Sequence, residues 1–382
     1  MRLFLSAGEP SGDLHGTSLI RSLRERVADL DVTGFGGDRM ADAGCRLVYP
    51  LCNHAVVGIG QALRSVPTFA RILGMARESF RADRPDALVM IDYPGFHWWL
   101  ARAAREEGVP VSYFVPPQIW AWGTWRAEKM RRLCDQVLCT LPFEEEWLRQ
   151  RGIPARYIGH PYFDDLSGQR LDARFLTEQR IRPGIVVALL PGSRSYELQH
   201  NVPVLKRAAE LIHERRPDVR FLVACLKAQH ADYVRGVIGS THLPLEIHQA
   251  RTPEIIELAH SCVAVSGSVS LELLYRGKPT AIVYRVPWFM RLIGLALMRS
   301  KYITLVNLLA DKLLFPEYVT TRCVAHQLAG HVLHWLHDQG AYRELCAELA
   351  ELKQTAAVPG ACERAASAIL DLVRGRDVRM AA

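Results

Sequence analysis

IVVALLPGSRSYEL, residues 185–198, decides how the second half of this chain folds. An apolar run as long as a buried strand breaks at Pro-Gly, and a segment with helical spacing begins near Glu197. Backbone N–H groups at a helix start, with Gly192, Ser193 and Arg194 beside them, suit an anion such as a phosphate. The turn lacks the Gly-Lys-Ser/Thr of a P-loop, which argues against nucleotide hydrolysis. The alternative is that Arg194 is an ordinary surface charge.

A second turn of the same kind lies in VSGSVSLELL, residues 265–274. It offers hydroxyls and backbone amides that suit a diphosphate. These groups belong to Ser266, Gly267, Ser268 and Ser270. Glu272 lies in the first helical turn, where it either caps the helix or binds a ribose diol. Two anion-suited turns in one half of the chain predict a nucleotide diphosphate ligand.

Short apolar runs alternate with helical segments along the chain, which predicts an α/β fold of parallel sheets with helices on both faces. The expected strands are 3–7, 32–35, 87–91, 111–115, 136–140, 156–158, 185–190, 220–224, 245–247, 263–265 and 280–283. Two similar halves indicate two Rossmann-like domains that face each other across a cleft. Ligands in such sheets bind beyond the carboxyl ends of the strands.

The length of 382 residues exceeds what one core normally supports, so two domains are expected. Turn-forming residues cluster near 159–168. We therefore expect a first domain at 1–165 and a second domain at 166–345. A helical C-terminal tail at 346–382 follows.

The composition is that of a soluble globular protein, with 49% apolar and 23% charged residues. The net charge of +7 fits nucleic acid, an anionic membrane surface or a phosphorylated substrate, and equally fits no anionic partner. The nine scattered cysteines indicate reduced thiols in the cytoplasm. No apolar run reaches the roughly 18 residues of a membrane span. The three histidines of HVLHWLHD (331–338) lack a further ligand signal, so no metal is predicted.

AGEPSGDLHG, residues 7–16, connects the first strand to the first helix. Its glycines, Gly12 among them, permit a tight turn, and Ser11 or Asp13 can cap the helix. The acidic side chains of Glu9 and Asp13 discourage a phosphate and suit sugar hydroxyls. We therefore place Glu9 among the candidate catalytic residues and Ser11, Gly12 and Asp13 on the acceptor side.

Asp92 ends the buried strand of IDYPGF, residues 91–96. A carboxylate at the carboxyl end of a strand can take a proton from an attacking hydroxyl. The alternative is that Asp92 caps nearby backbone amides.

Three tryptophans and four basic residues share the segment PPQIWAWGTWRAEKMRR, residues 116–132. It could stack on nucleic-acid bases or form a substrate loop, in which we place Trp120 on the acceptor side. Two further stretches, 59–80 and 287–309, are apolar with basic flanks. They suit a membrane surface, or an ordinary core or dimer helix.

Seven motifs in order resemble the lipid-A-disaccharide synthase family. They are AGEPSGD (7–13), PPQIWAW (116–122), LPFE (141–144), IGHP (158–161), LLPGSR (189–194), SGSVSLE (266–272) and LVNLLA (305–310). The resemblance runs from the first strand to about residue 315. It implies a GT-B glycosyltransferase that needs no metal or other cofactor. Such an enzyme joins UDP-2,3-diacylglucosamine to 2,3-diacylglucosamine 1-phosphate (lipid X) with inversion, giving a β-1,6 disaccharide and UDP.

The resemblance also implies roles for the domains and for single residues. It makes 1–165 the acceptor-binding domain and 166–345 the UDP-sugar-binding domain. It makes Asp92 the candidate base for the acceptor hydroxyl and places Arg194 at the UDP diphosphate. It places Asn307 near the donor, and Glu272 with its preceding serines in the nucleotide-binding turn. It further implies a homodimer with exchanged C-terminal segments, attached to the inner face of the cytoplasmic membrane.

The chain departs from the family pattern on the acceptor side. The family reads Asp-Phe-Asn where this chain has Gly95, Phe96 and His97, and Gln61 stands in place of a glutamate. The resemblance therefore predicts the class of the donor more securely than the identity of the acceptor. Two alternatives stay open, namely a related GT-B enzyme acting on another UDP-sugar reaction and an RNA-binding protein. The two anion-suited turns and the acidic first loop argue against nucleic acid.

Overall fold

The computed structural model describes residues 1–54, 66–239, 241–287 and 300–381. They form two compact units: a first unit of Met1–Ser167 with Val358–Ala382, and a second unit of Gly168–Ala357. Two sequence features lie outside the described residues. These are Gln61 with its motif and most of the apolar-basic stretch at 287–309.

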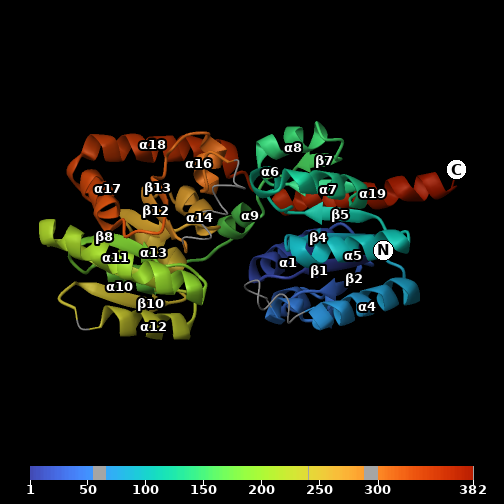
Figure 1. Ribbon diagram of the computed structural model, residues 1–382, viewed down its shortest axis with the longest axis horizontal. Coiled ribbons are helices and arrows are strands. Elements are labelled where there is room, and N and C mark those ends of the chain that lie inside the picture. Colours follow the sequence, from blue (N-terminus) through green and yellow to red (C-terminus); the bar gives the residue numbers. More distant parts are fainter. Residues whose placement is uncertain (55–65, 240, 288–299, 382) are drawn as a thin grey trace. The chain divides into compact units, whose positions relative to one another are not determined.

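The first unit is a seven-stranded sheet, all parallel, in the order β3-β2-β1-β4-β5-β6-β7 (Figure 1). The strands are β1 (Arg2–Ala7), β2 (Asp31–Phe35), β3 (Arg46–Tyr49), β4 (Ala87–Ile91), β5 (Val111–Phe114), β6 (Gln136–Cys139) and β7 (Ala155–Tyr157). The helices are α1 (Pro10–Arg24), α2 (Asp38–Asp42), η1 (Leu51–His54), α4 (Val66–Ala82), α5 (Pro94–Glu106), α6 (Ile119–Trp122), η2 (Thr124–Arg126), α7 (Ala127–Leu133), α8 (Pro142–Arg149), α9 (Tyr162–Ser167) and α19 (Ala361–Ala381).

Alternating side chains of these strands enter two separate cores. Phe4 and Met90 pack with α4, α5 and α7, whereas Leu5 and Ile91 pack with α1 and α19. Successive residues of a strand point to opposite faces, so a sheet covered on both sides needs nearly continuous apolar strands. This requirement explains runs such as ALVMI in β4.

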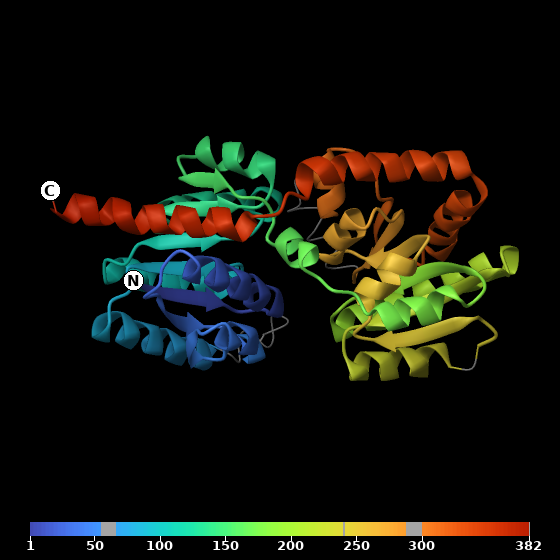
Figure 2. The same ribbon diagram turned by 180° about the vertical axis from the view of Figure 1, so that it is seen from behind.

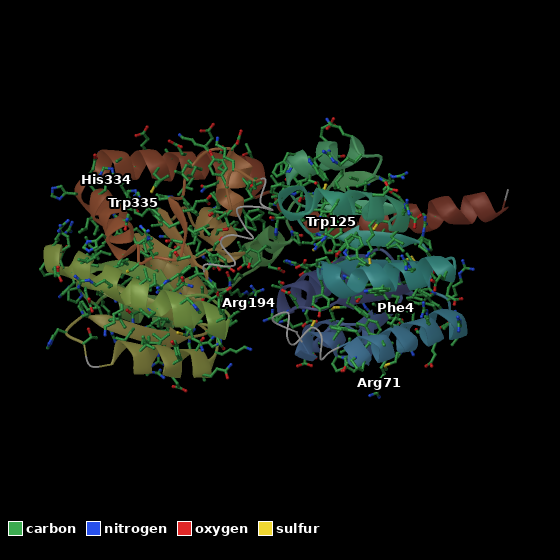
Figure 3. All side chains as sticks on the ribbon, viewed as in Figure 1. Phe4, Arg71, Trp125, Arg194, His334 and Trp335 are labelled. Atoms are coloured by element: carbon green, nitrogen blue, oxygen red, sulfur yellow. The ribbon has the colours of Figure 1, made fainter. Side chains whose placement is uncertain are left out.

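The second unit is a six-stranded parallel sheet in the order β10-β9-β8-β11-β12-β13 (Figure 2). The strands are β8 (Ile185–Leu190), β9 (Val219–Cys225), β10 (Leu245–Gln249), β11 (Ser261–Val265), β12 (Thr280–Arg285) and β13 (Glu317–Thr320). The helices are α10 (Ala173–Arg180), α11 (Ser195–Arg215), α12 (Ala228–Ile238), α13 (Thr252–Leu258), α14 (Val269–Tyr275), α16 (Leu305–Ala310), α17 (Ala325–His337) and α18 (Gln339–Ala356). Helices α11, α12 and α17 share one core with the sheet, and Trp335 of α17 is buried in it while His334 is exposed (Figure 3).

The predicted α/β class with parallel sheets is confirmed, and every predicted strand is present. Sequence reasoning missed β3 and β13, because RLVY and EYVT are short, half-exposed edge strands without a long apolar run. The helical tail is divided between the units. Helix α18 packs on α14 and α17 of the second unit, whereas α19 returns to the first unit against α1.

The return of α19 depends on Asp164. Its two carboxylate oxygens accept backbone N–H groups at the start of the helix, from Gly360 at 2.6 Å, Ala361 at 3.1 Å and Cys362 at 2.7 Å. The first amides of a helix have no partner inside the helix, so this carboxylate both satisfies them and anchors α19.

We predict that Asp164→Ala destabilises the protein by about 1 kcal/mol. Its melting temperature should fall by about 2–4 °C, while Asp164→Asn should lose less because asparagine also caps helices. Scanning calorimetry measures this, and Asp371→Ala, at an exposed position of the same helix, is the matched control. Equal melting temperatures for Asp164→Ala and wild type would contradict the anchoring role.

Candidate active site

The carboxyl ends of β1 and β4 bring Glu9, Ser11 and Asp92 to one edge of the first sheet. The two strands pair directly, with Ala7 opposite Ile91. A Cβ on Gly8 would lie 2.2 Å from the Tyr93 ring, so only glycine allows the two loops to meet this closely. Glu9 and Asp92 are half-buried, and Ser11 is exposed. This edge is where ligands of such sheets bind.

Three residues without glycine's freedom adopt left-handed backbone angles at this edge. Asp92 and Tyr93 both have φ of 50°, and Val115, after the neighbouring β5, has φ of 53°. Such conformations cost about 1–3 kcal/mol each and concentrate at functional sites. The strain therefore supports a functional role for the edge that carries Asp92.

The main-chain carbonyl of Asp92 accepts two hydrogen bonds inside the unit. His97 Nδ1 lies 2.6 Å from it, and the Tyr113 hydroxyl donates to it over 3.0 Å. His97 Nε2 lies 2.8 Å from Ser6 Oγ. Burial lowers the pKa of His97 to about 4, so its ring is neutral at pH 7. Sequence reasoning noted His97 only as a departure from the family and missed Ser6 and Tyr113.

Asp13 holds the second helix rather than the first. Its Oδ1 accepts the N–H groups of Gly37 at 2.8 Å and Met40 at 3.1 Å, and its Oδ2 accepts that of Arg39 at 3.2 Å. The prediction that Ser11 or Asp13 caps the first helix is wrong, because α1 begins earlier, with Glu9 at its N-cap and no side-chain cap. The carboxylate of buried Asp13 therefore supports the loop before the second helix, and its predicted place on the acceptor side stays a prediction.

Trp120 is tied to the LPFE motif. Its Nε1 donates to Glu144 Oε1 over 2.8 Å, and Glu144 Oε2 accepts the N–H groups of Thr140 and Leu141, each at 3.0 Å. Burial raises the pKa of Glu144, and these hydrogen bonds lower it in part. The Trp120 ring also meets Phe143 edge-on, with centroids 4.8 Å apart. The indole N–H is thus engaged, so any contact between Trp120 and an acceptor would use its ring.

In the second unit, β8 pairs with β11, so the two predicted anion turns lie side by side. Glu197 changes the first of them. Its buried carboxylate accepts the N–H groups of Ser193 at 2.9 Å and Arg194 at 3.2 Å. The two amides therefore donate to Glu197 in this structure, and their predicted contact with a phosphate stays a prediction. Gly192 has φ of 109°, and a Cβ there would lie 2.5 Å from Glu197 Oε2, so glycine is required.

The Arg194 side chain is what this turn offers to an anion. It is 54% exposed, with Nη1 3.4 Å from Glu197 Oε1 (Figure 3). Two more cations end neighbouring strands: Lys227 follows β9 and Arg285 closes β12. Sequence reasoning missed both, although a basic residue directly after an apolar strand was a signal. The carboxyl edge of this sheet is thus rich in positive charge.

The second turn exposes Gly267 and Ser268, with Ser266 half-buried. Ser270 is fully buried and its hydroxyl donates to Gly267 O over 2.8 Å, so it supports the turn. Its predicted contact with a diphosphate stays a prediction. Glu272 is buried and forms an ion pair with Arg276 at 3.1 Å. Its predicted role in capping the helix or binding a ribose diol stays a prediction.

Asn307 is buried and organises the loop that follows α16. Its Nδ2 donates to Phe315 O at 2.8 Å and Glu317 Oε2 at 3.0 Å, and its Oδ1 accepts the N–H groups of Leu314 and Phe315. The Asn307 amide uses its hydrogen-bonding groups inside this loop. Its predicted place near the donor stays a prediction, and any effect of Asn307 on the donor would pass through the loop.

A cavity of about 530 Å³ in the first unit is lined by Arg105, Pro110, Asp135 and Asp371 among others. Pro110 and Asp135 precede β5 and β6, so the cavity lies at the amino ends of the strands, away from Asp92. Among the described residues, no helix is long and apolar enough to cross a membrane. The same part of the chain contains no group of histidine, cysteine or acidic residues arranged to hold a metal ion.

Comparisons with solved structures give the fold. A putative UDP-N-acetylglucosamine 2-epimerase from Listeria monocytogenes matches nearly the whole chain, with a TM-score of 0.65 at 14% identity. The match covers 99% of this chain and 97% of that one. Medicago truncatula UGT71G1, complexed with UDP-glucose, matches with a TM-score of 0.61 at 15% identity, covering 97% and 98%. Two α/β units, each built on a sheet of parallel strands, define the GT-B class.

Sequence comparisons give the family. Residues 3–370 match the family described as LpxB, lipid-A-disaccharide synthetase. Lipid-A-disaccharide synthases of Geobacter sulfurreducens and Myxococcus xanthus are each 32% identical, over 97% of both chains. The chain belongs to the lipid-A-disaccharide synthase family, a family of glycosyltransferases of lipid A biosynthesis. The family implies a UDP-diacylglucosamine and lipid X as the substrates.

Buried neutral histidines should make the stability depend on pH. Burial lowers the pKa of His97 to about 4 and that of His160 to about 3, from an ordinary value of 6.5. Below pH 6.5 the unfolded chain binds protons that the folded chain does not, so stability falls as the pH drops from 6.5 towards 4. The slope is about 1.4 kcal/mol per pH unit for each such histidine.

Urea unfolding at several pH values measures this slope, which His97→Asn should reduce. The matched change at the exposed His334 should leave it as it is. An unchanged slope in His97→Asn would contradict a neutral, buried His97.

Proposed function

We propose that the two strand edges divide the lipid-A-disaccharide synthase reaction between them. The positive edge with Arg194 binds the UDP-2,3-diacylglucosamine donor, and the edge with Asp92 binds lipid X, 2,3-diacylglucosamine 1-phosphate. The observation that carries this proposal is the contrast in charge. Arg194 and Lys227 lie in the loops after β8 and β9, and Arg285 ends β12 of the second sheet, whereas Glu9 and Asp92 stand at the edge of the first. A diphosphate suits the former and a sugar hydroxyl the latter.

In the proposed mechanism, the 6-hydroxyl of lipid X attacks the anomeric carbon of the donor. Its proton passes to the Asp92 carboxylate as the new C–O bond forms. The bond from the anomeric carbon to the UDP oxygen breaks on the opposite face, which inverts the configuration and gives a β-1,6 linkage. Negative charge grows on UDP as it leaves, and the Arg194 guanidinium stabilises that charge. Glu9 lies at the same edge as Asp92 and orients the acceptor hydroxyls.

We predict that Asp92→Asn and Arg194→Ala fail at different steps. Arg194→Ala should lower kcat by roughly 100–1000-fold and weaken UDP binding, because a charge that stabilises the leaving group is lost. Asp92→Asn should lower kcat by roughly 100-fold or more, as expected when a general base is lost, with UDP affinity unchanged. UDP release in detergent micelles containing both substrates, and calorimetry with UDP, measure the two effects.

Matched controls are Arg207→Ala, an exposed arginine on α11, and Asp83→Asn, an exposed aspartate of the first unit. Wild-type turnover in either test variant would remove that residue from the mechanism. UDP binding without transfer to lipid X in the wild-type protein would favour the alternative, another reaction of a UDP-sugar enzyme.

We further propose that the chain is cytoplasmic and binds the inner face of the cytoplasmic membrane through a tryptophan patch on α5, η2 and α7. Trp99 is 57% exposed and Trp125 is 71% exposed. Trp125 is labelled in Figure 3. The Arg102, Arg126 and Lys129 cations stack on tryptophans, and no acidic side chain of the described residues forms an ion pair with these three. Indoles favour the headgroup region, and cations favour anionic lipids.

The electrostatics of the patch support an anionic partner. Burial lowers the pKa of Lys129, and the neighbouring Arg102 and Arg126 lower it further. An anionic surface would relieve this repulsion. The acyl chains of both substrates would then stay in the bilayer. A homodimer with exchanged C-terminal segments also remains a proposal: an α19 from a second copy would repeat the contacts that α19 makes with α1.

We predict that the protein sediments with vesicles containing anionic phospholipid and that salt weakens this binding. The double variant Trp99→Ala/Trp125→Ala should lose most of it, while Ile181→Ala, which removes a highly exposed apolar side chain of the second unit, should not. Salt-dependent RNA binding without vesicle binding would instead favour the nucleic-acid alternative.

A further inference from the structure

Four polar groups form a chain through the apolar core of the first unit. Ser6 of β1, His97 of α5 and Tyr113 of β5 are fully buried, and all three are linked to the main-chain carbonyl of Asp92 at the end of β4. The three strands are neighbours in the sheet order β1-β4-β5. Buried polar groups are kept only where each has a partner. Here His97 and Tyr113 share one backbone acceptor, and Ser6 pairs with His97.

The direction of the protons follows from the acceptor. A carbonyl oxygen can only accept, so the neutral His97 ring carries its proton on Nδ1 and donates it to Asp92 O. His97 Nε2 is then an acceptor, and the Ser6 hydroxyl donates to it. The Tyr113 hydroxyl donates to the same carbonyl. Loss of His97 would leave Ser6 without its acceptor and Asp92 O with one donor.

These hydrogen bonds oppose the strain of the turn. Asp92 and Tyr93 are both left-handed, a conformation that non-glycine residues keep only where surrounding contacts enforce it. Relaxation of φ at Asp92 to a negative value would rotate the chain about the N–Cα bond and move the Asp92 carbonyl away from both donors. The same rotation would turn the Asp92 side chain, because Cβ and the carbonyl carbon are both attached to Cα and turn together about that bond.

We propose that His97 is a positioning residue, which holds the Asp92 carbonyl so that the Asp92 carboxylate is aimed at the acceptor hydroxyl. This inference rests on the proposed role of Asp92 as the base. His97 stays in the core, with its ring packed near Tyr93, Phe96 and Tyr113, and acts only through the backbone of Asp92.

The proposal explains a tolerated difference between this chain and the family pattern, which has asparagine at this place. An asparagine side chain carries an N–H donor for Asp92 O and an oxygen that can accept from Ser6. Histidine and asparagine are thus alternative solutions to one requirement. Leucine has a comparable volume and offers neither group.

The test compares His97→Leu with His97→Asn in the full-length protein. A misplacement of about 1 Å at a reacting group costs on the order of 100-fold. His97→Leu should therefore lower kcat by about that factor, with KM for both substrates and UDP affinity unchanged. His97→Asn should recover most of this loss, and Tyr113→Phe, which removes the second donor, should fall between. His331→Leu, which removes a half-buried histidine bonded to Tyr318 in the second unit, is the matched control and should keep wild-type kcat.

Each outcome decides the matter. A folded His97→Leu with wild-type kcat, or equal losses in His97→Leu and His97→Asn, would overturn the positioning role. Should His97→Leu fail to fold, Ser6→Ala and Tyr113→Phe test the same chain, and wild-type kcat in both would overturn it. Asp92→Asn is measured alongside. If that variant is active, the proposed base is wrong, whereas an inactive Asp92→Asn beside a fully active His97→Leu refutes only the present inference.

Discussion

Parallel pairing between strands that are buried on both faces is the constraint on which the rest of this protein depends. It places all carboxyl ends of a sheet at one edge, so loops far apart in sequence meet there. Residues 8–11 lie beside Asp92 because β1 pairs with β4, and the two anion turns meet because β8 pairs with β11. The order of the strands therefore decides where the candidate catalytic and binding residues lie.

Acidic side chains that accept backbone amides shape the loops at these edges. Asp13, Glu144 and Glu197 each bind two or three amides of a neighbouring turn, and Asp164 does the same for α19. A carboxylate is an efficient cap because it accepts several hydrogen bonds and favours the positive end of a helix. Several motifs that suggested ligand contacts thus also contain residues that shape their own loops. The side chains left at the surface of those loops, such as Arg194 and Ser268, are the ones suited to bind.

The two edges differ in charge, and this difference fits the chemistry of the family. A nucleotide diphosphate needs cations, whereas activation of a hydroxyl needs a carboxylate whose charge is not cancelled by neighbouring cations. In this chain, the carboxylates and the cations suited to these two tasks lie on separate sheets. The buried chain from Ser6 to Asp92 shows a further requirement, which is that the carboxylate be held in a strained turn.

The sequence by itself determined the α/β class, nearly all strands, the family, and the positions of Asp92 and Arg194 at strand ends. Apolar runs of strand length and Pro-Gly turns are local signals, and ordered motifs survive in a single chain. Only the tertiary structure decided what each polar side chain binds. Glu197 takes the amides expected to hold phosphate, Ser270 and Asn307 serve their own loops, and His97 supports Asp92 from the core. A hydrogen bond between residues brought together by strand pairing leaves no periodic signal in the sequence, so these assignments required the folded chain.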